Sequence, residues 1–235
     1  MTEPPALELA GVVKDYKGLR PLRIASLVAA RGDRVAISGL DRPAAETLIG
    51  LITGAALPDE GEVRVLGRAT SAIASGDDWL ASLDRFGIVT ERVALLEGST
   101  LAQNLALSFT MAIDPVRPDV LANVLAIAAE VGLARPSVQD RAADSSPETR
   151  MRVRLGRALP LNPAILLLEH PTASLPPDAV AAFADDVARV VEARGLTAIA
   201  ITDDRTFAAR AAGRHVQLNA ATGELTDART RRWPW

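Results

Sequence analysis

Apolar and polar residues alternate early in the chain, around residues 7–13 and 22–27 and again at 61–65. A period of two is typical of β-strands that bury one face. These segments therefore predict an antiparallel β-region on the N-terminal side of the fold. The same pattern, with turn residues at its centre, predicts a hairpin at 215–225.

Three other runs are short and almost entirely apolar, at 35–37, 165–168 and 197–201. Such runs are typical of strands buried on both faces of a parallel sheet, and a further strand is predicted at 86–89. Apolar residues three or four positions apart predict helices between the strands, at 44–53, 149–159 and 178–194. Buried strands that alternate with helices indicate an α/β fold with a mainly parallel central sheet.

Between the strands, residues 99–131 are rich in Ala and Leu and have a helical pattern. The pattern is broken at Asp114-Pro115 and at Arg117-Pro118, because proline interrupts a helix. We predict a helical subdomain over about 99–160, within a single domain that covers 1–228. A basic and aromatic tail would follow at 229–235.

Composition narrows the class of protein. The chain has 235 residues, of which 49% are hydrophobic and 23% charged, so it is long enough for one well-packed domain. A net charge of -3 argues against a nucleic-acid binder, and the lack of cysteine excludes disulfides and Cys-bound metals. The first residues lack the pattern of a secretory leader, and no apolar run has the length of a membrane span. We therefore expect any association with a membrane to run through a partner.

Several stretches in order carry a family resemblance: 35–39, 47–54, 58–67 and 157–172. They resemble the P-loop strand and its helix, the next strand, and the region around the Walker B strand of ABC-transporter ATP-binding subunits. The resemblance runs over almost the whole chain. It implies a P-loop NTPase-like ABC ATPase domain with an N-terminal antiparallel β-subdomain and a helical subdomain. It also implies ATP as the ligand, docking on a membrane permease, and head-to-tail dimerisation.

A P-loop reads G-x-x-x-x-G-K-[ST]: its N–H groups hold phosphate, its Lys reaches the outer phosphates, and its hydroxyl binds Mg²⁺. In this frame Gly39 is present, but the second Gly, the Lys and the Ser/Thr fall on Ala44, Ala45 and Glu46. Pro43 offers no N–H to the phosphate. We therefore expect ATP to bind weakly and Mg²⁺ not to bind.

Glu46 would oppose phosphate directly, since two like charges about 4 Å apart repel by about 4 kcal/mol at an effective dielectric near 20. Arg42 and Thr47, with Gly39, are the residues left to contact a phosphate. A different interpretation is that Pro43 and Glu46 form an ordinary first helical turn. Glu46 would then supply from within the chain the negative charge that phosphate supplies elsewhere.

The other motif positions also differ from the family. The Walker B Asp-Glu pair falls on Glu169 and His170, the Q-loop Gln on Glu91, and the switch His on Asp203. No catalytic position is therefore intact. Glu169 has a carboxylate that could still reach a metal, and the imidazole of His170 could polarise water.

The L-S-G-G-Q signature aligns with residues 145–149 and retains Ser146, whereas Pro147 and Glu148 replace the glycines. In the family, this motif faces the ATP of the partner subunit. The resemblance therefore implies that a dimer with an active ABC ATPase, or with a second copy, would have two impaired sites.

Three further surfaces are candidates for binding. Tyr16 stands where the family stacks an aromatic ring on adenine, or is simply a Tyr at a strand edge. The apolar segment from Val93 to Leu105 is either the groove that receives a permease helix or part of the core. The tail 229–235 would contact anionic lipid or a partner, or would fray.

These observations favour a hydrolysis-deficient ABC subunit that acts as a scaffold or regulator on an integral membrane permease. It would lie peripherally at the cytoplasmic face of the membrane and would bind no nucleic acid. Two alternatives remain open. One is a divergent but active ATPase that uses Glu169, His170 and Arg42, and the other is a soluble partner-binding module without a transporter.

Overall fold

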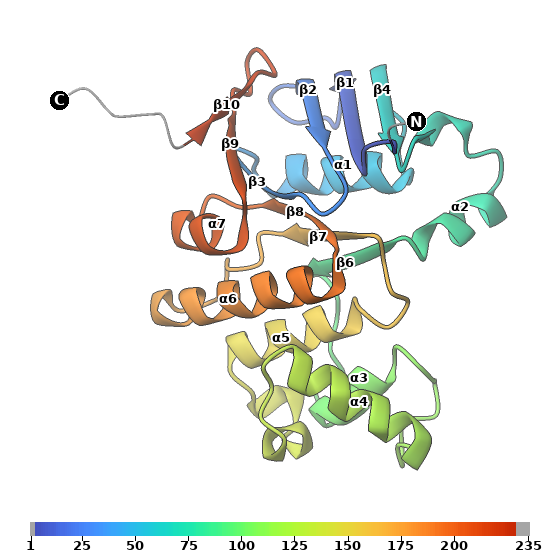
Figure 1. The fold of residues 1–235 in the computed structure, drawn as a ribbon, viewed down its shortest axis with the longest axis vertical. Helices are drawn as coiled ribbons and strands as arrows, with labels where there is room; N and C mark the ends of the chain where they lie inside the picture. Colours follow the sequence, from blue (N-terminus) through green and yellow to red (C-terminus); the bar gives the residue numbers. More distant parts are fainter. Residues whose placement is uncertain (1–2, 229–235) are drawn as a thin grey trace.

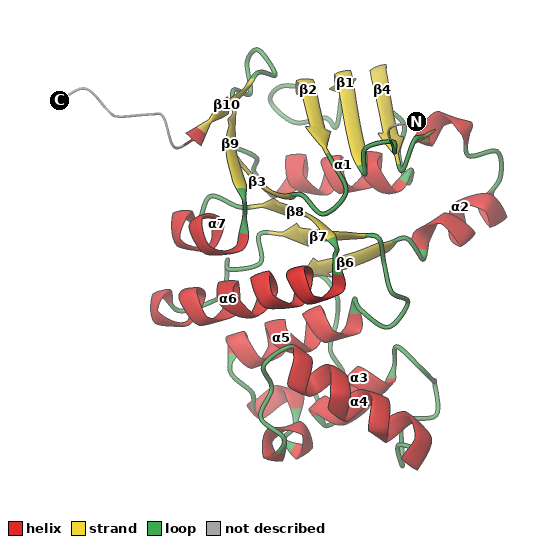
Figure 2. Cartoon of the chain, viewed as in Figure 1, coloured by secondary structure: helices red, strands yellow, loops and turns green. Residues whose placement is uncertain are grey.

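The computed structural model describes residues 3–228, which form two β-sheets with helices packed around the larger one (Figures 1 and 2). The smaller sheet is antiparallel, with the strand order β2-β1-β4-β5, and confirms the predicted β-region. Its strands are β1 (Leu7–Lys14), β2 (Leu22–Ala29), β4 (Glu60–Val65) and β5 (Arg68–Ala69). Leu7 and Leu9 of β1 are fully buried, as period-two alternation requires.

The larger sheet has six strands in the order β10-β9-β3-β8-β7-β6. It is formed by β3 (Arg34–Ser38), β6 (Phe86–Thr90), β7 (Ile165–Glu169), β8 (Thr197–Ile201), β9 (Arg214–Leu218) and β10 (Leu225–Asp227). All neighbouring strands are parallel except β10, which pairs antiparallel with β9 as the predicted C-terminal hairpin. Every residue of β7 and β8 is buried, which confirms strands covered on both faces.

Two cores cover the two faces of this sheet. Ile165 and Leu167 of β7 pack in the core that contains helix α1 (Arg42–Thr53) and the antiparallel sheet. Leu166 and Leu168 point the other way, into the core that contains helices α6 (Pro177–Arg194) and α7 (Arg205–Ala211). Figure 1 shows the resulting layers, with the central sheet between α1 and α6.

The remaining helices belong mainly to the Ala- and Leu-rich region. They are α3 (Leu101–Ala106), α4 (Pro118–Glu130) and α5 (Pro147–Arg157), drawn at the bottom of Figure 1, and α2 (Gly76–Leu83) near the antiparallel sheet. Short 3-10 turns are η1 (Thr70–Ala72), η2 (Pro136–Gln139) and η3 (Ala142–Asp144). The predicted break before α4 is confirmed, because Pro118 lies in the first turn of that helix. Within residues 3–228, no helix combines the length and the apolarity needed to cross a membrane.

Candidate functional site

The carboxyl ends of the parallel strands bring most of the predicted positions to one edge of the sheet. Gly39 directly follows β3, His170 directly follows β7, and Glu91 directly follows β6, while Asp203 lies two residues after the end of β8. Ligands of open α/β sheets bind at this edge, outside the carboxyl ends of the strands. Positions far apart in sequence thus form one neighbourhood at the N-terminal end of α1.

The loop after β3 is shorter than the P-loop frame suggests, because α1 begins at Arg42 and not at Ala44. Asp41 caps the helix: its carboxylate accepts the backbone N–H of Ala44 at 2.9 Å, and Pro43 occupies the first turn. An Asp followed two residues later by Pro is a helix-start signal, and it was available in the sequence.

One expectation about this helix is wrong. We expected Glu46 to supply negative charge to the N-terminus of the helix, but the first turn of α1 contains no acidic residue. The carboxylate that fills this role is that of Asp41. The physical reason is the earlier helix start, which places Glu46 beyond the first turn and directs it elsewhere.

A second carboxylate binds the loop itself. The backbone N–H of Gly39 donates to Asp203 Oδ1 over 2.8 Å. Gly39 has a φ of 89°, and a Cβ at this position would lie 2.8 Å from the Leu218 carbonyl oxygen. Two backbone donors at the place where a P-loop offers N–H groups to phosphate are therefore bound to carboxylates of this chain.

Arg92 occupies the centre of the site, and our sequence reasoning missed it. One of its nitrogens pairs with Glu46 on α1, and Nη2 lies 2.6 Å from Glu169 Oε2 at the end of β7. Burial alone would lower the pKa of Arg92, but the hydrogen bond and charge of Glu169, together with Glu46, raise it overall. The sequence signal that could have pointed to Arg92 is its place directly after Glu91, since a cation there adjoins a predicted site with several acidic residues.

These side chains line a cavity of about 210 Å³. Its lining residues are Arg42, Pro43, Glu46, Thr90, Glu91, Arg92, Glu169 and His170. Arg42 reaches Glu91 at 3.4 Å. The other Glu91 oxygen, Oε1, and His170 Nε2 are buried and have no hydrogen-bond partner among residues 3–228. His170 also has a φ of 42°, an uncommon backbone conformation that is often associated with functional sites.

A second cavity, of about 180 Å³, also borders the start of α1. Tyr16, Gly39, Asp41 and Ala44 all contribute to its lining, as do Arg20 and Arg23. Burial, and then the charge of Asp41, raise the pKa of Tyr16. The structure therefore brings Tyr16 next to the loop after β3.

Two positions near the start of α1 are engaged within the fold. The Thr47 hydroxyl donates to the Pro43 carbonyl oxygen at 2.8 Å, within α1, and Thr47 lines neither cavity. Ala45 is fully buried in the core. The hydroxyl proton of Thr47 is therefore already donated within the helix, and Thr47 as a phosphate contact stays a prediction.

The signature-like residues lie elsewhere, at the start of α5. Ser146 caps this helix by accepting the Thr149 N–H at 3.2 Å, and Pro147 occupies its first turn. Glu148 lies 2.5 Å from Arg152, which also contacts Asp186 of α6 at 2.7 Å. Neither cavity described above is lined by these residues.

The segment from Val93 to Leu105 divides into two parts. Leu95, Leu101 and Leu105 are core residues, and the side chain of Asn104 is fully buried and bonded to the backbone of Leu96. Of the two interpretations of this segment, groove or core, the core interpretation therefore applies to these residues.

The loop at the start of this segment remains accessible, with Leu96 45% exposed. Two arginines of α5 hold it in place: Arg154 donates to the Val93 carbonyl at 3.0 Å, and Arg157 to the Ala94 carbonyl at 2.8 Å. The predicted tail contact at 229–235 lies outside the described residues.

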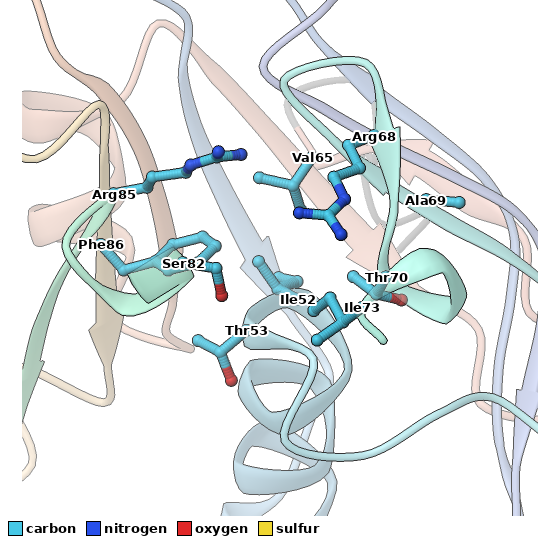
Figure 3. A pocket seen from close by; sticks show the side chains of 10 residues that line it. All are labelled: Ile52, Thr53, Val65, Arg68, Ala69, Thr70, Ile73, Ser82, Arg85 and Phe86. Carbon is cyan, nitrogen blue, oxygen red and sulfur yellow. The ribbon is translucent and has the colours of Figure 1, made fainter. Parts of the chain in front are cut away.

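A small cavity of about 20 Å³ lies between α1, β5 and α2, apart from the candidate site (Figure 3). Its lining is largely apolar, with Ile52, Val65 and Ile73 around it, and includes the buried Thr70 hydroxyl, which has no partner within residues 3–228. A space of this size holds one water molecule and is too small for a nucleotide.

Comparison with known proteins identifies the family. The sequence profile described as ABC transporter matches residues 23–173. The chain is 30% identical over 211 residues to the Fe(3+) ions import ATP-binding protein FbpC of Mesorhizobium japonicum, covering 88% of this chain and 57% of that protein. It is 28% identical over 219 residues to the methionine import ATP-binding protein MetN of Brucella abortus, a match that covers 93% of this chain and 58% of that protein. The chain thus spans less than two thirds of the length of these relatives.

Solved structures support the same fold. The cbiO1 protein of Clostridium perfringens, part of the ABC transporter complex cbiONQ, matches with a TM-score of 0.79 at 20% identity. The match covers 95% of this chain and 88% of the cbiO1 chain. A dimeric ATP-binding cassette in a post-hydrolysis state with ADP and Pi matches with a TM-score of 0.74 at 21% identity. The match covers 96% of this chain and 100% of that cassette. With the ATPase cassette fold and a profile match over residues 23–173, the chain belongs to the ABC transporter family.

Proposed function

We propose that this chain is a hydrolysis-deficient ATP-binding-subunit homologue of an ABC import system. In this proposal it docks on an integral membrane permease at the cytoplasmic face of the membrane and acts as a scaffold or regulator. The relatives named above are import ATP-binding proteins, which supports the transporter context. Pairing takes place with a second ABC ATPase subunit or with another copy of this chain.

One observation carries the proposal: carboxylates of this chain already occupy two N–H groups at the phosphate-binding loop. Asp203 accepts from Gly39, and Asp41 accepts from Ala44. A phosphate within about 4 Å of one of these carboxylates meets about 4 kcal/mol of repulsion at an effective dielectric near 20. That energy weakens a micromolar affinity to about millimolar.

Magnesium fits this site poorly as well. The two positions that align with the Mg²⁺-binding residues of P-loop NTPases are Glu46 and Glu169, and both are paired with Arg92. Within residues 3–228, no three His, Cys, Asp or Glu side chains are grouped so as to hold a metal ion. No catalytic step is therefore assigned to a metal in this proposal.

Isothermal titration with ATP, with and without Mg²⁺, tests the nucleotide part of the proposal. We expect dissociation constants of about millimolar or weaker and no strengthening by Mg²⁺. A dissociation constant in the low micromolar range would contradict it. The docking part is tested by whether the tagged chain co-purifies an integral membrane protein from detergent-solubilised membranes, using Leu96→Glu as the variant that introduces a charge into the exposed loop. Equal recovery with wild type would exclude this loop from the docking surface.

A divergent ATPase is the second candidate, favoured by His170 alone. His170 lines the 210 Å³ cavity next to Glu169, its Nε2 has no hydrogen-bond partner among residues 3–228, and its backbone has a positive φ. The test compares ATP turnover by wild type, His170→Ala and Glu169→Gln. Turnover that both substitutions abolish would establish this candidate and displace the scaffold proposal.

A further inference from the structure

The guanidinium of Arg92 joins three separate parts of the fold. Arg92 lies in the loop after β6, Glu46 lies on α1, and Glu169 ends β7. The Nη1 group pairs with Glu46, and Nη2 donates to Glu169 Oε2 over 2.6 Å. Glu169 is only 6% exposed, whereas Glu46 is on the open side of the cavity. The fork of Arg92 thus binds one buried and one exposed carboxylate together.

The position of this bridge is informative. In P-loop NTPases, a divalent cation is held between the Ser/Thr of the P-loop and the Walker B Asp. In this chain the aligned positions are Glu46 and Glu169, and a cationic side chain lies between them. We infer that Arg92 is an internal replacement for the divalent cation, so that the closed arrangement of α1, β7 and the β6 loop needs no metal.

Charge balance supports the assignment. Three carboxylates line the cavity, those of Glu46, Glu91 and Glu169, and the cations of Arg42 and Arg92 face them. Arg42 is 70% exposed and contacts only Glu91 among these acids, at 3.4 Å. Removal of Arg92 leaves the buried Glu169 without a counter-charge, which strongly disfavours the folded state. In that variant a divalent cation would bind between the carboxylates of Glu46 and Glu169, because hard cations prefer oxygen donors of this kind.

This inference deepens the proposed function and rests on it for the location of the site, but its test contains no nucleotide. Mn²⁺ binding is followed by electron paramagnetic resonance, and the melting temperature is measured with and without millimolar Mg²⁺. The proteins are the full chain as wild type, Arg92→Gln, and Arg42→Gln as the matched control, which removes one positive charge from the same cavity.

We expect wild type and Arg42→Gln to bind no Mn²⁺ and to show no Mg²⁺-dependent change in melting temperature. We expect Arg92→Gln to melt lower, to bind Mn²⁺, and to regain about 4 °C at Mg²⁺ concentrations about tenfold above the dissociation constant. Submillimolar Mn²⁺ binding by wild type would overturn the inference. So would an Arg92→Gln variant that binds no metal, whatever its melting temperature.

If Arg92→Gln does not fold, Arg92→Lys replaces it, because an ammonium keeps the positive charge but lacks the planar fork. We then expect Arg92→Lys to melt lower than wild type, since one ammonium does not bind both carboxylates as the fork does, and to bind no Mn²⁺, since a cation remains between Glu46 and Glu169. Submillimolar Mn²⁺ binding by Arg92→Lys, or a melting temperature equal to that of wild type, would overturn the inference. Since ATP is not present, neither result depends on whether the chain binds or hydrolyses nucleotide, so failure here is distinguishable from failure of the proposed function.

Discussion

Gly39 and Asp203 are joined by a 2.8 Å hydrogen bond from the backbone N–H of the first to the carboxylate of the second. The bond links the loop after β3 to the loop after β8. We expect Asp203→Ala to lower the free energy of unfolding by about 1 kcal/mol, because Gly39 loses a charged acceptor. Asp203→Asn keeps an acceptor oxygen and should lose less. Urea denaturation measures both, and an Asp203→Ala variant as stable as wild type would show that the bond contributes nothing to stability.

Asp41 offers a separate test of the start of α1. Its carboxylate accepts the Ala44 N–H at 2.9 Å as a helix cap. Asp41→Ala should cost about 1 kcal/mol of unfolding free energy, whereas Asp41→Ser, which retains a capping oxygen, should cost a few tenths. Thermal melts of the two variants provide the comparison. If Asp41→Ser is as destabilised as Asp41→Ala, the role of Asp41 is not that of a cap.

The backbone at Gly39 requires glycine. Its φ of 89° disfavours any side chain, and a Cβ would lie 2.8 Å from the Leu218 carbonyl oxygen and 2.6 Å from Gln217 Nε2. Gly39→Ala should therefore lower the free energy of unfolding by about 2 kcal/mol. Gly76→Ala is the matched control, because a Cβ there meets no atom within 4 Å. A Gly39→Ala variant as stable as this control would contradict the prediction.

A pH-dependent contribution to stability is expected away from the site, at the pair that joins β5 to α2. The hydrogen bond from Arg68, and then that from the Ala74 N–H, lower the pKa of Asp78 from 3.8 to about 2. The folded state therefore holds the proton less tightly than the unfolded state. The contribution of Asp78 is fully present above about pH 4 and is lost as the pH falls towards 2.

Asp78→Asn should accordingly lower the denaturant midpoint near neutral pH, and its difference from wild type should shrink between about pH 4 and pH 2. Asp77→Asn is the control, since it removes the neighbouring carboxyl and leaves the Arg68–Asp78 pair in place. A difference for Asp78→Asn that stays constant over this pH range would show that the pair is not the cause.

The fold was largely predictable because its signals are local. The strand at Thr197–Ile201 was predicted to the residue, since five buried residues in a row have few other interpretations. The helix α6 differed by one residue from its predicted start. Helix α2 was missed, because it is short and buries only Ser82 among its residues. No apolar stripe therefore marked it.

The site was less predictable because its contacts are long-range. Comparison with the family motifs located Glu46 and Glu169. The cation between them, Arg92, lies in a loop that is 46 residues after Glu46 and 77 residues before Glu169. Nothing in the local sequence around Arg92 indicates those partners. The capping role of Asp41, in contrast, has a local signal, because an Asp followed by Pro43 is typical of the start of a helix.

In P-loop proteins, the charges that bring these loops together arrive and depart with the ligand. In this chain the corresponding charges belong to Asp41, Asp203 and Arg92, which are permanent parts of the polypeptide. We therefore expect the conformation of this chain to be the same at high and at low ratios of ATP to ADP in the cell. Under the proposed function, an assembly that contains this chain would take the timing of its cycle from another subunit.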